Sequence, residues 1–184
     1  KAISITASRS SSPSPSPTIG IGDGITADIH ISNAEVSRST GAGLIVGSSY
    51  NGKITVAGIL EAESNFLTEV VTVLASKAAS FIEFKTKSST FNGLAAHGSA
   101  GVFVETHLTA DTEYMWFDAD VDDTTSDSGS SEKLDVTDGR TLTATTVMTL
   151  ASKSGTLTPR GAFTLRSAGG IVVQDQFTSA GTAG

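Results

Sequence analysis

The sequence contains no cysteine among its 184 residues. This absence excludes a disulfide framework, a thiolate nucleophile and a zinc–thiolate site. Charged residues are scarce at 17%, and the formal net charge is −7, from 12 basic and 19 acidic residues with no run of Lys or Arg. A protein that follows a phosphate backbone needs such a run, so nucleic acid is not an expected partner.

Long hydrophobic runs are also missing. The apolar stretches are too short to cross a bilayer, so we expect no transmembrane segment. The chain opens on Lys1 without a signal-peptide pattern, and we interpret it as a mature or excised segment. Its length favours a single domain with a sizeable core.

Small polar residues dominate what is present, with 26 Ser, 25 Thr and 19 Gly, whereas good helix formers are few. Thr favours strands, and Ser and Gly favour turns. Alternation of apolar and polar residues predicts strands in residues 2–7, 18–22, 28–32, 44–47, 53–57, 70–76, 80–86, 101–106 and 114–118. Residues 59–79 are ambiguous between helix and strand, and we expect strand because of their β-branched cluster.

A regular beat runs through the last third of the chain. It consists of Leu142, Leu150, Leu157, Leu165 and Val173, which lie seven or eight residues apart. Antiparallel hairpins would give a similar beat, but no Asn-Gly or Asp-Gly turn follows Thr141. We therefore predict an all-β fold, a parallel β-helix (β-solenoid) of short strands, with an antiparallel β-sandwich as the alternative. Coils of roughly 20 residues would give about nine coils.

Several segments resemble the repeat unit of very large, strand-rich surface proteins. They are TIGIGDGITADIHISNAEVSR, GLIVGSSYNGKITVAGI, LTADTEYMWFDADVDD, TDGRTLTATTVMTLASKSGTLTP and GAFTLRSAGGIVVQDQFTSAG. Such units occur in filamentous-haemagglutinin-like adhesins of bacteria and in giant repeat proteins of microalgae and other aquatic protists. The resemblance implies a parallel β-helix with a structural or adhesive role outside the cell or at its surface, and it implies no catalytic residues.

The pattern divides the chain into two parts. Residues 1–18 are expected to form an edge strand and an exposed Ser-Pro-rich segment, and residues 19–184 a single β-solenoid-like domain, one unit of a longer array. Alternation continues to both ends without a charged cap. The expected partners are further copies of the chain or adjacent units, with glycans as a second class, and the expected function is self-association into a filament, fibre or surface layer.

The Ser-Pro-rich segment cannot join a central strand ladder, because proline lacks the N–H donor. An exposed linker is one interpretation, and O-linked glycan attachment is the other. The glycosylation candidates are Ser12, Pro13, Ser14, Pro15, Ser16, Pro17 and Thr18.

An acidic stretch, FDADVDDTTSDSG, begins at Phe117. Its spacing fails as an EF-hand because Asp123 stands where glycine is required. Two interpretations stay open: an acidic loop in which residues 118–129 face water after Phe117 anchors in the core, and an irregular calcium site. The candidate calcium ligands are Asp120, Asp122, Asp123 and Asp127.

No complete catalytic constellation is present, so we do not expect an enzyme. His30 is expected to point outward from a strand, His97 to lie in a turn beside Gly98, and His107 to follow a strand. The alternative function is a carbohydrate-binding or polysaccharide-processing β-helix that uses Trp116 and the nearby aspartates. Tyr114 and Trp116 would share one strand face and the next residues the other, so one of the two pairs is expected in the core.

Overall fold

The fold is built from short parallel strands with two small helices. The computed structural model describes residues 1–7, 16–124 and 132–178. Every strand ladder among these residues is parallel. The all-β class is therefore confirmed, and the antiparallel sandwich is wrong. No helix in the described ranges is long and apolar enough to cross a membrane.

The strands form three sheets. Sheet I contains, in spatial order, β1 (Ile3–Ile5), β4 (Leu44–Ser48), β6 (Val70–Ala75), β9 (Gly93–Gly98), β12 (Met115–Asp118), β15 (Met148–Ala151) and β18 (Ile171–Val173). Sheet II contains β3 (Ile29–Ile31), β2 (Ile19–Gly22), β5 (Ile54–Ala57), β7 (Ile82–Phe84), β10 (Val102–Val104), β13 (Lys133–Thr137) and β16 (Thr156–Arg160). Sheet III contains β8 (Ser89–Phe91), β11 (Leu108–Ala110), β14 (Arg140–Ala144) and β17 (Phe163–Ser167).

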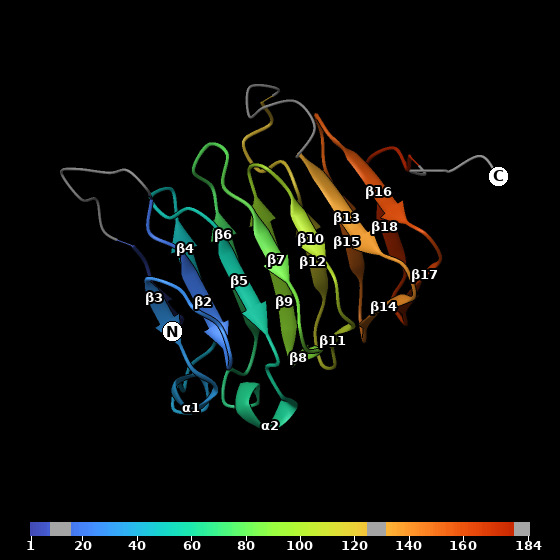
Figure 1. The fold of residues 1–184 in the computed structure, drawn as a ribbon. Coiled ribbons are helices and arrows are strands. Elements are labelled where there is room, and N and C mark those ends of the chain that lie inside the picture. The colour runs from blue at the N-terminus through green and yellow to red at the C-terminus, as the bar shows by residue number, and fades with distance from the viewer. Residues whose placement is uncertain (8–15, 125–131, 179–184) are drawn as a thin grey trace.

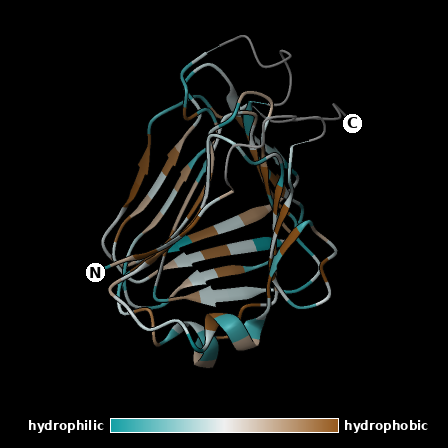
Figure 2. Cartoon of the chain, turned by 90° about the vertical axis from the view of Figure 1, so that its left-hand side faces the viewer, coloured by the Kyte–Doolittle hydropathy of each residue, from teal (hydrophilic) through white to brown (hydrophobic). Residues whose placement is uncertain are grey.

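From β4 onward, the chain returns to sheet I once per circuit and advances by one strand position each time, whereas β2 and β3 are consecutive strands of sheet II. For example, β9, β10 and β11 lie in sheets I, II and III, and β12, β13 and β14 pair with them as the next strands. The strands stack from the N-terminal to the C-terminal side in Figure 1. Figure 2, viewed along the stack, shows the three sheets around a common interior.

The Leu beat marks this circuit. Leu142 lies in β14 of sheet III, Leu150 in β15 of sheet I, and Leu157 in β16 of sheet II, and all three are buried. The beat continues through Leu165 in β17 and Val173 in β18. Successive members of the beat therefore lie in successive sheets rather than in the two strands of a hairpin. Three members complete one circuit.

Inward-facing aliphatic side chains form rows along the stack. In sheet I, the row Leu44, Val71, Leu94, Met115 and Met148 is in register, and each of these residues is at most 2% exposed. Alternation places one side chain of each pair in the interior and the next outside. Burial of such rows stabilises the fold at roughly 25 cal/mol per Å² of apolar surface.

Two one-turn helices take the third side of the first circuits, where sheet III has no strand. Helix α1 (Asn33–Val36) packs against α2 (Glu61–Ser64), and α2 packs against β8 (Figure 1). Each helix is capped by a Glu side chain: Glu35 Oε2 accepts the Ser32 N–H, and Glu63 Oε2 accepts the Leu60 N–H, both at 2.8 Å. The prediction of strand for residues 59–79 is therefore wrong at α2 and right at β6.

The number of coils was overestimated. Among the described residues, the two longest sheets have seven strands each, fewer than the nine coils expected, because one circuit takes more residues than assumed. Register partners in sheet I are 23 residues apart from Val71 to Leu94, 21 from Leu94 to Met115 and 33 from Met115 to Met148. The longest of these intervals contains the acidic stretch.

Candidate functional site

The acidic stretch leaves sheet I at the end of β12. Phe117 is fully buried, as predicted, and packs edge-to-face with Phe84 at 6.1 Å between ring centroids. The prediction that residues 118–129 face water is wrong at Asp120, which is 1% exposed. Asp120 Oδ2 accepts the backbone N–H of Ser154 at 2.5 Å, whereas Oδ1 has no hydrogen-bond partner. Asp120 thus ties this stretch to the next coil.

The candidate calcium ligands are differently engaged. Asp123 forms an ion pair with Lys153 at 2.7 Å, and Asp127 lies outside the described residues. Asp122 lies in a turn and makes an interaction of its own. Within the part of the chain that the structure describes, no group of three or more His, Asp or Glu side chains could hold a metal ion. The ammonium of Lys153 supplies positive charge beside Asp123, and calcium binding by these aspartates stays a prediction.

A polar hollow of about 300 Å³ opens beside this ion pair. It is lined by Asp118, Asp123, Ala151, Lys153, Gln174 and Asp175. Asp175 is held in place by the backbone N–H of Ser152, which donates to Oδ2 at 2.7 Å. The hydrogen bond to Asp123, together with its charge, raises the pKa of Lys153 above its usual value, so the ammonium stays protonated at neutral pH.

Aromatic side chains stand on the outer face of sheet I next to the hollow. Met115 and Phe117 are fully buried, whereas Trp116 is 38% and Tyr114 is 37% exposed. The prediction that one of these pairs lies in the core is therefore confirmed. Trp116 and Asp118 both point outward from β12 because they are two residues apart. Asp118 consequently lies beside Trp116 on the outer face of β12 and also lines the hollow.

His97 was expected in a turn, and this is wrong. It lies in β9, directly beside Asp118 in the parallel register. Its ring meets the Trp116 indole edge-to-face, with 4.7 Å between the centroids and 85° between the planes. His97 Nδ1 lies 3.9 Å from Asp118 Oδ2. Sequence reasoning missed this trio because Gly and Ala on both sides of His97 have low strand propensity.

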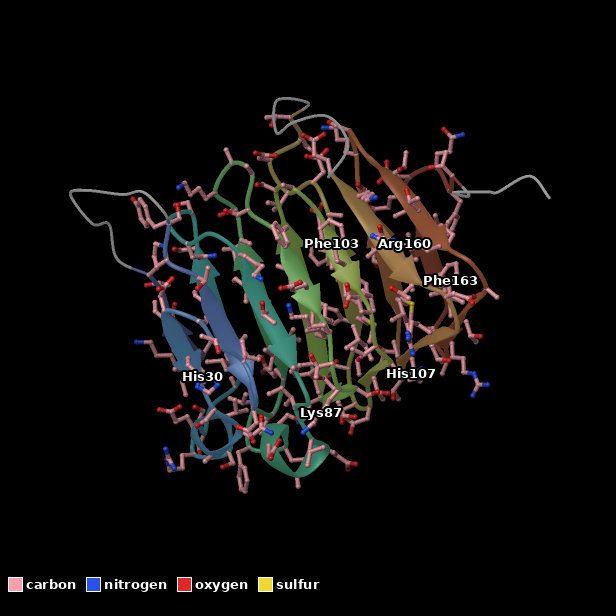
Figure 3. The ribbon with its side chains drawn as sticks, viewed as in Figure 1. His30, Lys87, Phe103, His107, Arg160 and Phe163 are labelled. Atoms are coloured by element: carbon pink, nitrogen blue, oxygen red, sulfur yellow. The ribbon has the colours of Figure 1, made fainter. Side chains whose placement is uncertain are left out.

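The other two histidines, His30 and His107, lie apart from each other (Figure 3). His30 points outward from β3, as expected, and its Nε2 lies 2.6 Å from the Gly22 carbonyl oxygen. His107 follows β10, and its Nδ1 accepts the backbone N–H of Thr141 at 3.1 Å. Both imidazoles bond to the backbone, so the three histidines form no shared site.

The outer face of sheet II carries ion pairs that sequence reasoning did not find. Glu83 accepts from Lys53 Nζ at 2.6 Å, Lys85 Nζ at 2.8 Å and Thr55 Oγ1 at 2.9 Å. Burial of Glu83 opposes its ionisation, but the three hydrogen bonds outweigh burial and lower the pKa of this carboxyl. Lys53 and Thr55 come from the adjacent coil and are far from Glu83 in the sequence, so no local sequence pattern predicts the network.

A second acidic residue on this face is enclosed in the same way. The Asp135 side chain is 2% exposed and pairs with Lys133 at 3.1 Å and with Arg160 at 2.7 Å. Phe103 lies between the two acids in the register and packs edge-to-face with Phe81, with 5.5 Å between the ring centroids. Figure 3 shows Phe103 and Arg160 on the same face. The acidic side chains on the outer face of sheet II are therefore enclosed by ion pairs, whereas the outer face of sheet I carries exposed aromatic side chains.

The glycosylation candidates fall into two groups. Ser12, Pro13, Ser14 and Pro15 lie outside the described residues. Of the others, Ser16 accepts a hydrogen bond from Lys77 Nζ, Pro17 accepts the Gly52 N–H at 2.9 Å, and Thr18 Oγ1 donates to Asp28 Oδ2 at 2.9 Å. These three residues are half-buried. Glycan attachment at any of the seven stays a prediction.

The C-terminal side of the stack exposes the ends of the core rows. Ile171, Val172 and Val173 of β18 are 41%, 44% and 42% exposed. Phe163 and Leu165 of β17 are only partly buried. Strands β18 and β17 are the outermost strands of sheets I and III on this side.

The comparisons with known proteins add no relative. No protein-family model matches the chain, and neither a curated protein nor a solved structure matches it.

Proposed function

We propose that the three sheets form a parallel β-helix, and that the chain is a structural unit that joins copies of itself end to end into a filament, fibre or surface layer. One observation carries this proposal. The row that contains Met115 and Met148, both fully buried, continues to Ile171, which is 41% exposed. A core row that ends in solvent leaves apolar surface and unpaired strand groups for another chain to cover.

Sheet I also ends in an apolar strand at the opposite side of the stack. Strand β1 is the other outermost strand of sheet I, and its inward residues Ile3 and Ile5 pack against the core. Strand β18 likewise presents Ile171 and Val173 two residues apart. If β1 of a second copy pairs with β18 in parallel register, each isoleucine of β1 continues an inward row.

Contact between two different ends is heterologous. Such a contact produces an open fibre when the rotation between copies does not close a ring. Sheet I then runs through successive copies, and the backbone hydrogen bonds of the sheet run along the fibre axis. The proposal includes an extracellular or cell-surface location and an adhesive role, because segments of the sequence resemble the repeat units of giant surface proteins.

The test is electron microscopy of the purified chain, with light scattering to measure the mass in solution. We expect fibres or sheets for the unchanged protein. The variant Val173→Lys places a charge in the exposed end of an inward row, and it should leave monomers. The control Val172→Lys lies on the same strand with similar exposure but points outward, and it should still assemble. If the unchanged protein is still monomeric at about 1 mM, the proposal is contradicted, because an end-to-end interface weaker than this contributes less than about 4 kcal/mol.

A further inference from the structure

The outer face of sheet I carries an aromatic line beside a polar hollow. Tyr114 comes directly before β12 and Trp116 lies in it, both partly exposed, and extended geometry places their Cα atoms roughly 7 Å apart. In the outward row across the strands, the neighbours of Trp116 are Ala95 and Thr149. Both are too small to cover an indole, which is why the ring is 38% exposed in the middle of a sheet.

The indole is held in a fixed orientation. The His97 ring meets it edge-to-face at 4.7 Å, an arrangement that the quadrupoles of the two rings favour. His97 in turn lies against the Asp118 carboxylate, with 3.9 Å between Nδ1 and Oδ2, and Asp118 Oδ1 accepts the Asp120 N–H at 3.2 Å. A ring fixed in this way loses little freedom when a ligand stacks on it.

Asp118 connects the aromatic residues with the hollow, because it follows Trp116 by two residues in β12 and also lines the hollow. The hollow offers hydrogen-bond acceptors at Asp118 and Asp175 and donors at Lys153 and Gln174. Two of these groups are already positioned: Asp175 by the Ser152 N–H at 2.7 Å, and Lys153 by Asp123 at 2.7 Å. Its volume of about 300 Å³ is at the lower limit of small-molecule sites.

We propose that this surface binds a neutral saccharide chain, with Tyr114 and Trp116 stacking on sugar rings and the hollow binding the hydroxyls of an adjacent sugar unit. A pyranose has an apolar C–H face and a rim of hydroxyls that both donate and accept. A fixed aromatic ring beside mixed donors and acceptors matches both parts of that chemistry. An apolar peptide would leave the polar groups of the hollow unpaired, which is unfavourable.

Charge restricts the saccharide further. The hollow holds the carboxylates of Asp118, Asp123 and Asp175 against the single ammonium of Lys153, and the whole chain carries −7. A uronate or sulfated glycan would meet this field as a like charge. We therefore assign the site to neutral glycans, and binding requires no chemical step. The assignment does not depend on assembly, because all its residues lie within one chain.

Fluorescence provides a direct test, because Trp116 is the only tryptophan in the chain. The probes are hexasaccharides of β-linked glucose, mannose and galactose, with polygalacturonate as the anionic control. We expect a saturable change in tryptophan emission with at least one of the neutral hexasaccharides and none with polygalacturonate. No saturable change with any of the three up to about 10 mM would overturn the assignment, and so would tighter binding of the polyuronate.

Variants tested by calorimetry separate this site from binding elsewhere. Trp116→Ala should weaken binding by tenfold or more, and Asp118→Asn and Asp175→Asn, which keep the side-chain shape, should each weaken it by about tenfold. The matched control is Tyr50→Ala, which removes an aromatic residue that is 45% exposed and lies after β4, outside the site. It should bind as the unchanged protein does. Undiminished binding by Asp118→Asn and Asp175→Asn, with melting temperatures unchanged, would contradict the assignment even if Trp116→Ala failed to fold.

Discussion

Arg160 and Asp135 form an ion pair between neighbouring strands β16 and β13, in which Arg160 Nε and Nη2 donate to Asp135 Oδ2 at 2.9 and 2.7 Å. The Asp135 side chain is almost fully buried, whereas the Arg160 side chain is 56% exposed. The hydrogen bonds that Arg160 donates to Asp135, together with the charge of that carboxylate, raise the pKa of Arg160. The pair therefore joins two neighbouring strands on the outer face of sheet II, and the Arg160 side chain covers the Asp135 carboxylate.

Replacement of the buried partner should weaken this junction. In Asp135→Asn, the cations of Lys133 and Arg160 face each other without a carboxylate between them. We expect the free energy of unfolding to fall by about 2 kcal/mol, below the 3–5 kcal/mol typical of a broken buried pair, because both cations can regain water. Urea unfolding measures the change. Asp138→Asn, in an exposed turn, is the control, and an equal loss there would refute the explanation.

The Glu83 network predicts a pH dependence. Because the folded pKa of Glu83 lies below its ordinary value of 4.5, ionised Glu83 stabilises the fold above pH 4.5, and this stabilisation is lost as the pH falls through the folded pKa. Glu83→Gln should therefore be less stable than the unchanged protein at pH 7 by about 1 kcal/mol. The difference should shrink below pH 4.5. Melting curves from pH 7 to pH 3 test this, and a difference that grows in acid would contradict it.

A glycine at the end of β4 should be irreplaceable. Gly47 has a φ of +101°, and a Cβ there would collide with the Leu74 carbonyl oxygen of the next coil. Gly47→Ala should cost about 3 kcal/mol through backbone strain and displacement of the ladder. The matched control is Gly24→Ala, where φ is +76° but nothing lies within 4 Å, so the expected cost is only about 1 kcal/mol. Equal costs in thermal unfolding would show that the collision is relieved.

The acidic stretch should not require calcium for stability. Lys153 neutralises Asp123, and the Ser154 N–H donates to one oxygen of Asp120, so these two aspartates have partners within the fold. We expect the melting temperature to change by less than about 2 °C when a chelator is added, which is below the shift that 1 kcal/mol produces. A rise in the melting temperature on titration with calcium would contradict this expectation and support the metal site predicted from the sequence.

Sequence reasoning found the features that depend on local alternation. The opposite faces of Trp116 and Phe117 follow from strand geometry alone, and the Leu beat distinguished a parallel circuit from hairpins. It failed where burial overrides propensity. Residues Gly93–Gly98 form the central strand β9 because β6 and β12 flank it, although Gly and Ala disfavour strands in isolation.

The candidate site could be predicted only in part for a related reason. Trp116 and the aspartates after it are adjacent in sequence and were recognised together. Lys153 and Asp175 reach the same hollow from the connections that follow β15 and β18, and nothing local in the sequence indicates that they meet. The depth of Asp120 was missed because its partner, the Ser154 N–H, is a backbone group of the next coil.

The uneven circuit between Met115 and Met148 has a practical consequence. These two residues are in register although 33 positions separate them, whereas 21 separate Leu94 and Met115. The strands on either side keep their pairing regardless of the length of chain between β12 and β13, and loop length adds little entropic cost. This connection is therefore the place where a foreign peptide could be grafted. In an assembled fibre, it would display that peptide once per copy at a regular interval along the axis.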